Sequence, residues 1–138
     1  MLLDTVKTPA DVKKLNIKQL EALADEIRNR VVDVVGKNGG HLASNLGVAE
    51  LIVALYYSFD FPKDKLIFDV GHQCYAHKIL SGRNEMFDTL RQENGLNGFP
   101  DISESEFDAF GAGHAGSSLS ACLGYCAARD AIGDDYYV

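Results

Sequence analysis

The stretch LIFDVGHQ, residues 66–73, decides how this chain is expected to fold. Its first five residues form a short, nearly continuous apolar run rich in β-forming side chains, which is typical of a strand buried on both faces of a parallel sheet. Gly71 and His72 follow directly, at the carboxyl end of that strand. Ligands of open α/β sheets bind beyond the carboxyl ends of the strands, so His72 is a candidate site residue.

The chain on either side of this stretch predicts an α/β fold, a truncated parallel sheet with surrounding helices. Residues 135–138 are expected to begin a second strand, and residues 92–113 to form an extended loop. A sheet of two strands leaves an unpaired edge and exposed apolar surface. Capping residues and apolar spacing predict six helices. They are expected from Pro9, from Ile17 to Gly36, from Val48 to about Pro62, after Gln73 through about Leu80, around Met86 to Leu90, and from about Ser117 to Gly133. The last helix is expected to turn inward Leu119, Cys122, Leu123, Cys126 and Ala127.

Length and composition indicate one soluble globular domain. The 138 residues are 46% hydrophobic and 24% charged, with 20 acidic against 13 basic residues and a net charge of −7. This balance argues against a nucleic-acid-binding surface, which needs a basic patch. The longest apolar stretch, residues 51–57, is too short to span a bilayer, and the first residues lack the features of a signal peptide. We therefore expect a cytoplasmic protein with no membrane partner.

Three Gly-His pairs punctuate the chain where loops are expected to meet regular elements. Glycine lets the backbone approach a ligand closely, and imidazole donates hydrogen bonds, moves protons or ligates metal near neutral pH. We therefore expect the three imidazoles to converge on one polar site. Asn38, Ser44 and Asn45 would add a polar wall beside the first of them. The pairs are Gly40-His41, Gly71-His72 and Gly113-His114.

The segment Gly111–Ser118 leads into the N-terminus of the last expected helix. A helix N-terminus offers unpaired N–H groups and the positive end of the helix dipole, which suit a phosphate. Glycines at three positions of the segment would let its backbone come close enough to donate, and His114 adds a further donor. The alternative is an ordinary glycine-rich turn.

Several other polar residues have plain structural interpretations. His77 is expected either to lie at the surface or to pack within the fold. His72 could be a histidine at a strand end whose ring is hydrogen-bonded within the protein and binds no ligand. A zinc site formed by His72, Cys74 and His77 is disfavoured, because this is not a usual spacing of zinc ligands. Cys122 and Cys126, one helical turn apart, could ligate a metal or pack as small apolar residues. The acidic residues of the long loop would form a solvated face or order the loop over a site; they are Asp101, Glu104, Glu106 and Asp108.

A set of motifs gives the chain a family resemblance. They are HLASNLG at residues 41–47, FDVGHQ at 68–73, HKILSGR at 77–83, TLRQ at 89–92, ESEFDAFG at 104–111 and Gly-His at 113–114. In this order and spacing they resemble the amino-terminal part of the 1-deoxy-D-xylulose-5-phosphate synthase family, which are thiamine-diphosphate enzymes of the transketolase superfamily. The motifs cover most of residues 1–138.

The resemblance implies an activity and its cofactors. The family joins pyruvate to glyceraldehyde 3-phosphate with loss of carbon dioxide, and the product feeds isoprenoid, thiamine and pyridoxal synthesis. It implies a transferase that uses thiamine diphosphate and Mg²⁺ and works as a homodimer. Residues 1–138 would be an incomplete diphosphate-binding domain, with the Mg²⁺ ligands beyond this chain and the family's other domains absent.

The resemblance also implies roles for single residues. His72 would lie at the thiamine diphosphate, and Gly113, His114 and Ala115 would line its diphosphate. His41 would face the substrate and act in catalysis by hydrogen bonding or proton transfer. Many members carry Ser where this chain has Ala115, so a weaker diphosphate contact is expected.

Two interpretations of function remain. In the first, this piece of the synthase is inactive alone, because the family's metal-binding carboxylate and cofactor-activating glutamate are missing. In the alternative, the chain is a non-catalytic, stand-alone binding or regulatory module derived from the family. A related transketolase or dehydrogenase half-subunit fits less well, because residues 77–83 and 104–111 look specific to the synthase.

Overall fold

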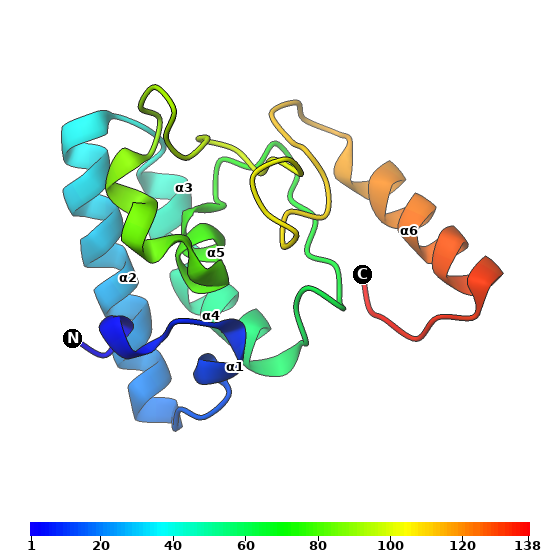
Figure 1. Ribbon diagram of the computed structural model, residues 1–138, viewed down its shortest axis with the longest axis horizontal. Helices are drawn as coiled ribbons and strands as arrows, with labels where there is room; N and C mark the ends of the chain where they lie inside the picture. The colour runs from blue at the N-terminus through cyan, green and yellow to red at the C-terminus, as the bar shows by residue number, and fades with distance from the viewer.

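The computed structural model describes all of residues 1–138, and its regular structure is entirely helical (Figure 1). Residues 90–117 connect the eighth and ninth elements without a helix or strand, as expected for the long loop. The elements in chain order are η1 (Leu3–Thr5), α1 (Pro9–Val12), α2 (Ile17–Asn38), α3 (Ala43–Leu46), α4 (Ala49–Ser58), α5 (Tyr75–Lys78), η2 (Ile79–Arg83), η3 (Asn84–Thr89) and α6 (Ser118–Ile132). None of the helices is long and apolar enough to cross a membrane.

The expected parallel sheet is absent, so the prediction of an α/β fold is wrong. The two segments expected to be strands, 66–70 and 135–138, do approach each other, because the Lys65 N–H donates to the Tyr137 carbonyl at 2.8 Å. No second backbone bond joins them, and the Tyr137 N–H donates instead to the Asp64 carboxylate at 2.8 Å. A strand exists only where a neighbour pairs its backbone along several residues. An apolar run alone therefore does not make a sheet.

Helix α2 is the longest element and has well-defined ends. At its start the Asn16 side chain accepts from the Gln19 N–H at 3.0 Å, and the Gln19 side chain accepts from the Asn16 N–H at 2.9 Å. The helix continues through Gly36 and ends at Asn38, where Gly39 leaves the helical conformation with φ +76°. The predicted stop at Gly36 is therefore too early by two residues, because a glycine inside a helix costs only about 1 kcal/mol.

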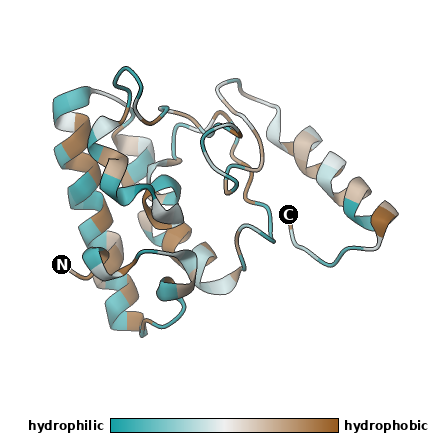
Figure 2. Cartoon of the chain, in the orientation of Figure 1, coloured by the Kyte–Doolittle hydropathy of each residue, from teal (hydrophilic) through white to brown (hydrophobic).

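The hydrophobic core lies between α2 and its neighbours, chiefly α4. Figure 2 shows apolar and polar positions alternating along α2, as expected of a helix with one buried face. That face meets Ile52, Val53 and Tyr56 of α4, all nearly inaccessible to solvent. Each large aliphatic side chain buried in this way contributes about 1.5–3 kcal/mol relative to exposure. The buried residues of α2 are Leu23, Ala24, Ile27, Val31, Val34 and Val35.

Helix α6 lies apart from the other helices (Figure 1) and contains no buried residue. Leu119 is 83% exposed and Leu123 is 70% exposed, so the prediction that this helix turns its apolar residues inward is wrong. Cys122 and Cys126 are half-buried free thiols, and Ala127 is exposed. The helical spacing of apolar residues shows which face could be buried, but it does not provide the surface that would cover it.

Candidate functional site

His41 and His72 meet at the centre of the candidate site, although 31 positions separate them in the chain. Their ring centroids lie 4.0 Å apart, with the ring planes inclined by 37°. His41 belongs to the loop between α2 and α3, and His72 to the loop that precedes α5. The fold thus pairs two of the three histidines that follow a glycine.

Asn45 of α3 holds the two histidine loops together. Its side-chain amide donates to the carbonyl of His41 at 2.6 Å and to the carbonyl of His72 at 2.7 Å. Its side-chain oxygen accepts from the Tyr75 N–H at 2.9 Å, at the first residue of α5. The side chain is buried, since Asn45 is only 2% exposed. Asn45 therefore joins three segments through one amide, and its role is to fix the histidines rather than to line a wall.

Two glycines allow these loops to pack closely. Gly40 has φ +135°, and a β-carbon at this position would lie 2.7 Å from the Tyr75 hydroxyl oxygen. Gly71 has φ +89°, and a β-carbon there would lie 2.5 Å from Pro100. Neither contact leaves room for a side chain, and both conformations favour glycine. The glycines before His41 and His72 thus serve close packing within the protein.

The His41 ring is electrostatically unusual. Burial, the neighbouring His72 ring and the positive charge of Arg91 all lower the pKa of His41, so its imidazole is neutral at neutral pH. Its Nδ1 is buried and has no hydrogen-bond partner in the protein. A buried polar atom without a partner is costly, and such atoms are uncommon away from functional sites. This ring is therefore suited to exchange a hydrogen bond or a proton with a bound molecule.

Arg91 is a candidate residue that the sequence did not single out. Its side chain packs beside Gly40 and Gly98, and its guanidinium makes no ion pair or hydrogen bond. Its backbone adopts φ +61°, which is uncommon for a residue other than glycine. The nearest signal in the sequence was the TLRQ motif at residues 89–92, which marks Arg91 by resemblance alone.

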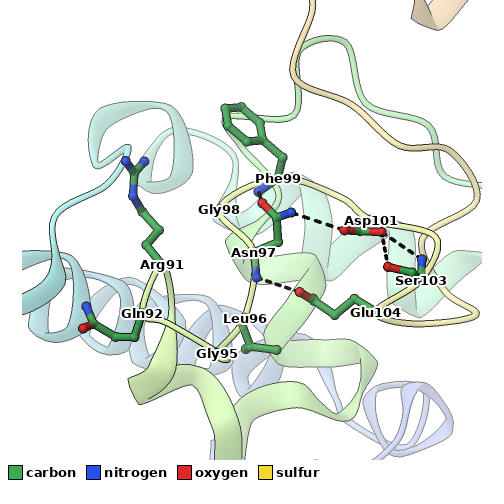
Figure 3. A pocket seen from close by; sticks show the side chains of 10 residues that line it. All are labelled: Arg91, Gln92, Gly95, Leu96, Asn97, Gly98, Phe99, Asp101, Ser103 and Glu104. Carbon is green, nitrogen blue, oxygen red and sulfur yellow. Dashed lines mark hydrogen bonds between the residues drawn. The ribbon is translucent and has the colours of Figure 1, made fainter.

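The long loop and its flanking residues line a polar cavity of about 570 Å³ (Figure 3), which adjoins the histidine pair at Phe99. Phe99 connects the two, because it lines the cavity while its ring lies 5.5 Å from the His41 ring and 5.7 Å from the His72 ring. Arg91 and Phe99 extend toward the same side in Figure 3. The cavity is lined by Arg91, Gln92, Gly95, Leu96, Asn97, Gly98, Phe99, Asp101, Ser103 and Glu104.

His114, the third histidine of the expected site, is exposed and makes no ring contact with the other two. Its segment begins near them, because a β-carbon at Gly71 would lie 3.1 Å from Ala112. The backbone N–H groups of Gly113, His114 and Ala115 make no hydrogen bond within the chain. These three N–H groups are therefore available to a ligand. Of the three imidazoles expected to converge, only those of His41 and His72 come together.

The donors at the start of α6 are already engaged by Asp69. Its carboxylate accepts from the Gly116 N–H at 2.9 Å and from the Ser118 hydroxyl at 2.7 Å. Hydrogen bonds from Ser118 and Gly116 hold the pKa of Asp69 below its usual range. A carboxylate thus occupies one part of the predicted phosphate cradle, while the donors of residues 113–115 remain free.

A buried ionic cluster lies behind the site, and the sequence did not predict it. Its members are His77, Lys78, Arg83, Glu104 and Asp108. His77 is 1% exposed; its Nδ1 lies 2.8 Å from the Tyr56 hydroxyl and its Nε2 lies 2.8 Å from the Asp108 carboxylate. This arrangement fits a neutral ring that accepts at Nδ1 and donates from Nε2, and burial lowers the pKa of His77. Of the surface and packing roles expected for His77, the structure shows the buried one, with polar and ionic groups converging on its ring.

The cluster also fixes the position and the ionisation of acidic residues in the long loop. Although burial opposes ionisation, hydrogen bonds from Arg83 and His77 hold the pKa of Asp108 well below its usual range. Asp108 and Glu104 face the cluster, whereas Glu106 is exposed. Asp101 accepts from the Ser103 N–H at 2.8 Å and from the Asn97 side chain at 3.3 Å within the loop. Three of the four acidic residues therefore order the loop, and only Glu106 has the solvated role that was the alternative. No group of three or more His, Cys, Asp and Glu side chains could hold a metal ion.

Comparison with known proteins places this geometry in a family context. A family model described as 1-deoxy-D-xylulose-5-phosphate synthase matches residues 3–138. The chain is 56% identical over 137 residues to the 1-deoxy-D-xylulose-5-phosphate synthase of Caldanaerobacter subterraneus subsp. tengcongensis, covering 99% of this chain and 22% of that protein. It is 52% identical over 138 residues to the enzyme of that name from Thermus thermophilus, covering 100% of this chain and 22% of that protein. The chain spans about a fifth of the length of these curated relatives.

Proposed function

From the premise that this chain belongs to the 1-deoxy-D-xylulose-5-phosphate synthase family, we propose that it forms part of a thiamine-diphosphate site of such a transferase. The reaction would join pyruvate to glyceraldehyde 3-phosphate with loss of carbon dioxide, in isoprenoid precursor synthesis. The observation that carries the proposal is the pairing of His41 with His72 beside the unpartnered Nδ1 of His41. The relatives' shared printed name supports the choice of reaction.

The residues present fit the cofactor in two places. His72, which makes no side-chain hydrogen bond in the protein, would contact the thiamine diphosphate, and the free N–H groups of Gly113, His114 and Ala115 would donate to its diphosphate. When bound, thiamine diphosphate supplies the carbanion chemistry of decarboxylation. Mg²⁺ would accompany the diphosphate, with ligands from outside these 138 residues.

His41 would act on the substrate side. Because its imidazole is neutral at neutral pH, Nδ1 can either accept a hydrogen bond or donate one, depending on the tautomer. A neutral imidazole is also able to take up or release a proton at the reacting group. Asn45 and Phe99 keep this ring in place and partly shielded from water.

Arg91 would supply positive charge for the substrates. Both pyruvate and glyceraldehyde 3-phosphate are anions, and a guanidinium binds carboxylate or phosphate with two parallel hydrogen bonds. Arg91 has no acidic partner within the chain and lines the open cavity next to Phe99. The cavity would then be the side from which substrate reaches the histidine pair.

A chimera tests the proposed function. Residues 1–138 would replace the matching fifth of the Caldanaerobacter enzyme, to which they are 56% identical. We expect the chimera to form the sugar phosphate from pyruvate and glyceraldehyde 3-phosphate when thiamine diphosphate and Mg²⁺ are supplied. His41→Ala should lower kcat/KM by about 100-fold or more, as expected for loss of a proton-transferring group. His72→Ala should mainly weaken thiamine diphosphate binding, measured by calorimetry.

Leu51→Ala is the matched control, since Leu51 is 58% exposed on α4 and does not line the cavity. It should leave kcat/KM unchanged within about twofold. A folded chimera without activity, or histidine variants as active as the control, would refute the proposal. The isolated chain is proposed to be inactive, because it corresponds to about a fifth of the relatives. Product formation by purified residues 1–138 would contradict this part.

A further inference from the structure

Phe99 is held in the histidine pair by a loop that has no regular structure of its own. Residues 97–108 contain no helix or strand, yet the Phe99 ring contacts His41 and His72 at once. Fixing the backbone of one loop residue costs about 1–2 kcal/mol of conformational entropy. Other contacts must therefore hold this loop in place.

Two carboxylates fix the loop on either side of Phe99. Glu104 accepts from the Asn97 N–H at 2.7 Å, and Asp108 accepts from the Asp101 N–H at 2.9 Å. These two donors stand two residues before and two residues after Phe99. The first bond is visible in Figure 3, where Glu104 reaches back to the loop. The backbone that carries the Phe99 ring is thus clamped at both ends.

The carboxylates are themselves fixed from the other side of the cluster. Arg83 donates to both oxygens of Asp108, at 2.7 and 2.8 Å, and to Glu104 at 2.6 Å. Lys78, fully buried, bonds to Glu104 and lies 3.8 Å from Asp108. These cations belong to the segment formed by α5 and η2, which follows directly after the loop of His72. The cluster therefore ties the loop to the frame that carries the site.

We propose that Asp108 and Glu104 are positioning residues, which hold the Phe99 ring against the paired rings of His41 and His72. They touch neither ring and act only through the loop backbone. The inference rests on the proposed function in one respect, that the histidine pair is the site. Its consequence is that the shielding of His41 from water depends on a cluster buried behind the site.

Nuclear magnetic resonance of the 138-residue chain tests this inference directly. The sequence has four histidines, so the ring signals are few and can be assigned. In the wild type we expect nuclear Overhauser effects between the Phe99 ring protons and the rings of His41 and His72. Asp108→Asn keeps the size of the side chain but removes its charge, and these effects should then be lost. The exposed ring of His114 serves as an internal reference whose signal should not move.

Three further variants separate positioning from general destabilisation. Glu104→Gln is the milder test, since Glu104 is partly exposed, and it decides the matter if Asp108→Asn does not fold. Leu23→Ala opens a cavity in the core of α2 without touching the cluster, so it should retain the Overhauser effects. Phe99→Leu should remove them and thereby identify the signals.

Two outcomes would overturn the inference. In the first, the Overhauser effects persist in a folded Asp108→Asn or Glu104→Gln chain. In the second, Leu23→Ala loses them as well, which would mean that any loosening of the fold displaces Phe99. None of these measurements needs cofactor or substrate. The positioning role can therefore fail while the chimera is active, and it can hold while the chimera is inactive.

Discussion

Replacing Asn45 by Ala should destabilise the protein more than its size suggests. The change removes three hydrogen bonds, to the carbonyls of His41 and His72 and from the Tyr75 N–H, all around a side chain that is 2% exposed. A typical hydrogen bond contributes about 0.5–1.5 kcal/mol net, so the free energy of unfolding should fall by about 2–4 kcal/mol. Domains are stable by only about 5–15 kcal/mol, so the loss is a large share of the total.

Urea denaturation followed by far-ultraviolet circular dichroism measures this loss. The midpoint should fall at an unchanged m-value, because the surface exposed on unfolding is nearly the same. Ser44→Ala is the matched control, since its hydroxyl makes one long bond of 3.4 Å to the same His72 carbonyl. It should cost less than about 0.5 kcal/mol. Equal losses in the two variants would show that Asn45 does not hold the histidine loops together.

Three further changes have defined outcomes. The folded-state pKa of Asp108 lies well below its unfolded value of 3.8. The stabilisation that its carboxylate provides is therefore fully present above about pH 4, and it is lost as the pH falls below that value toward the folded-state pKa. Asp108→Asn should therefore cost about 3–5 kcal/mol at neutral pH, and the stability gap to the wild type should narrow in urea titrations at lower pH. The double change Leu119→Gln and Leu123→Gln should alter the free energy of unfolding by less than about 0.5 kcal/mol, because both residues are exposed. It should also reduce any self-association of the chain measured by light scattering, because it removes exposed apolar surface. Asp69→Ala should lower hydrogen-exchange protection in the first turn of α6 by about 0.5–2 kcal/mol, because it removes the acceptor for the Gly116 N–H and the Ser118 hydroxyl, as loss of a helix cap does.

The sequence predicted well those features that depend on neighbours in the chain. The start of a helix at Ile17 and the periodic apolar face of α2 are local patterns, and the structure reproduces both. The extended loop at residues 92–113 followed from its composition alone. Such features need no knowledge of distant contacts, because the backbone and the helix period determine them.

The sequence failed where the outcome depended on a partner surface. Residues 66–70 have the composition of a buried strand, but they form no backbone hydrogen bond with the segment at 135–138; the one such bond comes from the preceding residue, Lys65. Helix α6 has apolar residues at helical spacing and nothing packed against them. Composition reports what a segment can bury, whereas strand and core formation also require the covering surface. The ionic cluster escaped notice for the same reason, since its charges come from segments about 20 to 30 positions apart.

One short segment, residues 72–83, connects the candidate site with its support. Its first residue is His72, and the Tyr75 N–H donates to the side-chain oxygen of Asn45, whose amide fixes both histidine loops. On the other side of the same segment, Arg83 holds the carboxylate of Asp108. Because this segment is anchored from both sides, the histidine pair is placed by buried polar contacts rather than by a sheet. The rigidity that a parallel sheet would have supplied at strand ends is here supplied by an amide and an ionic cluster.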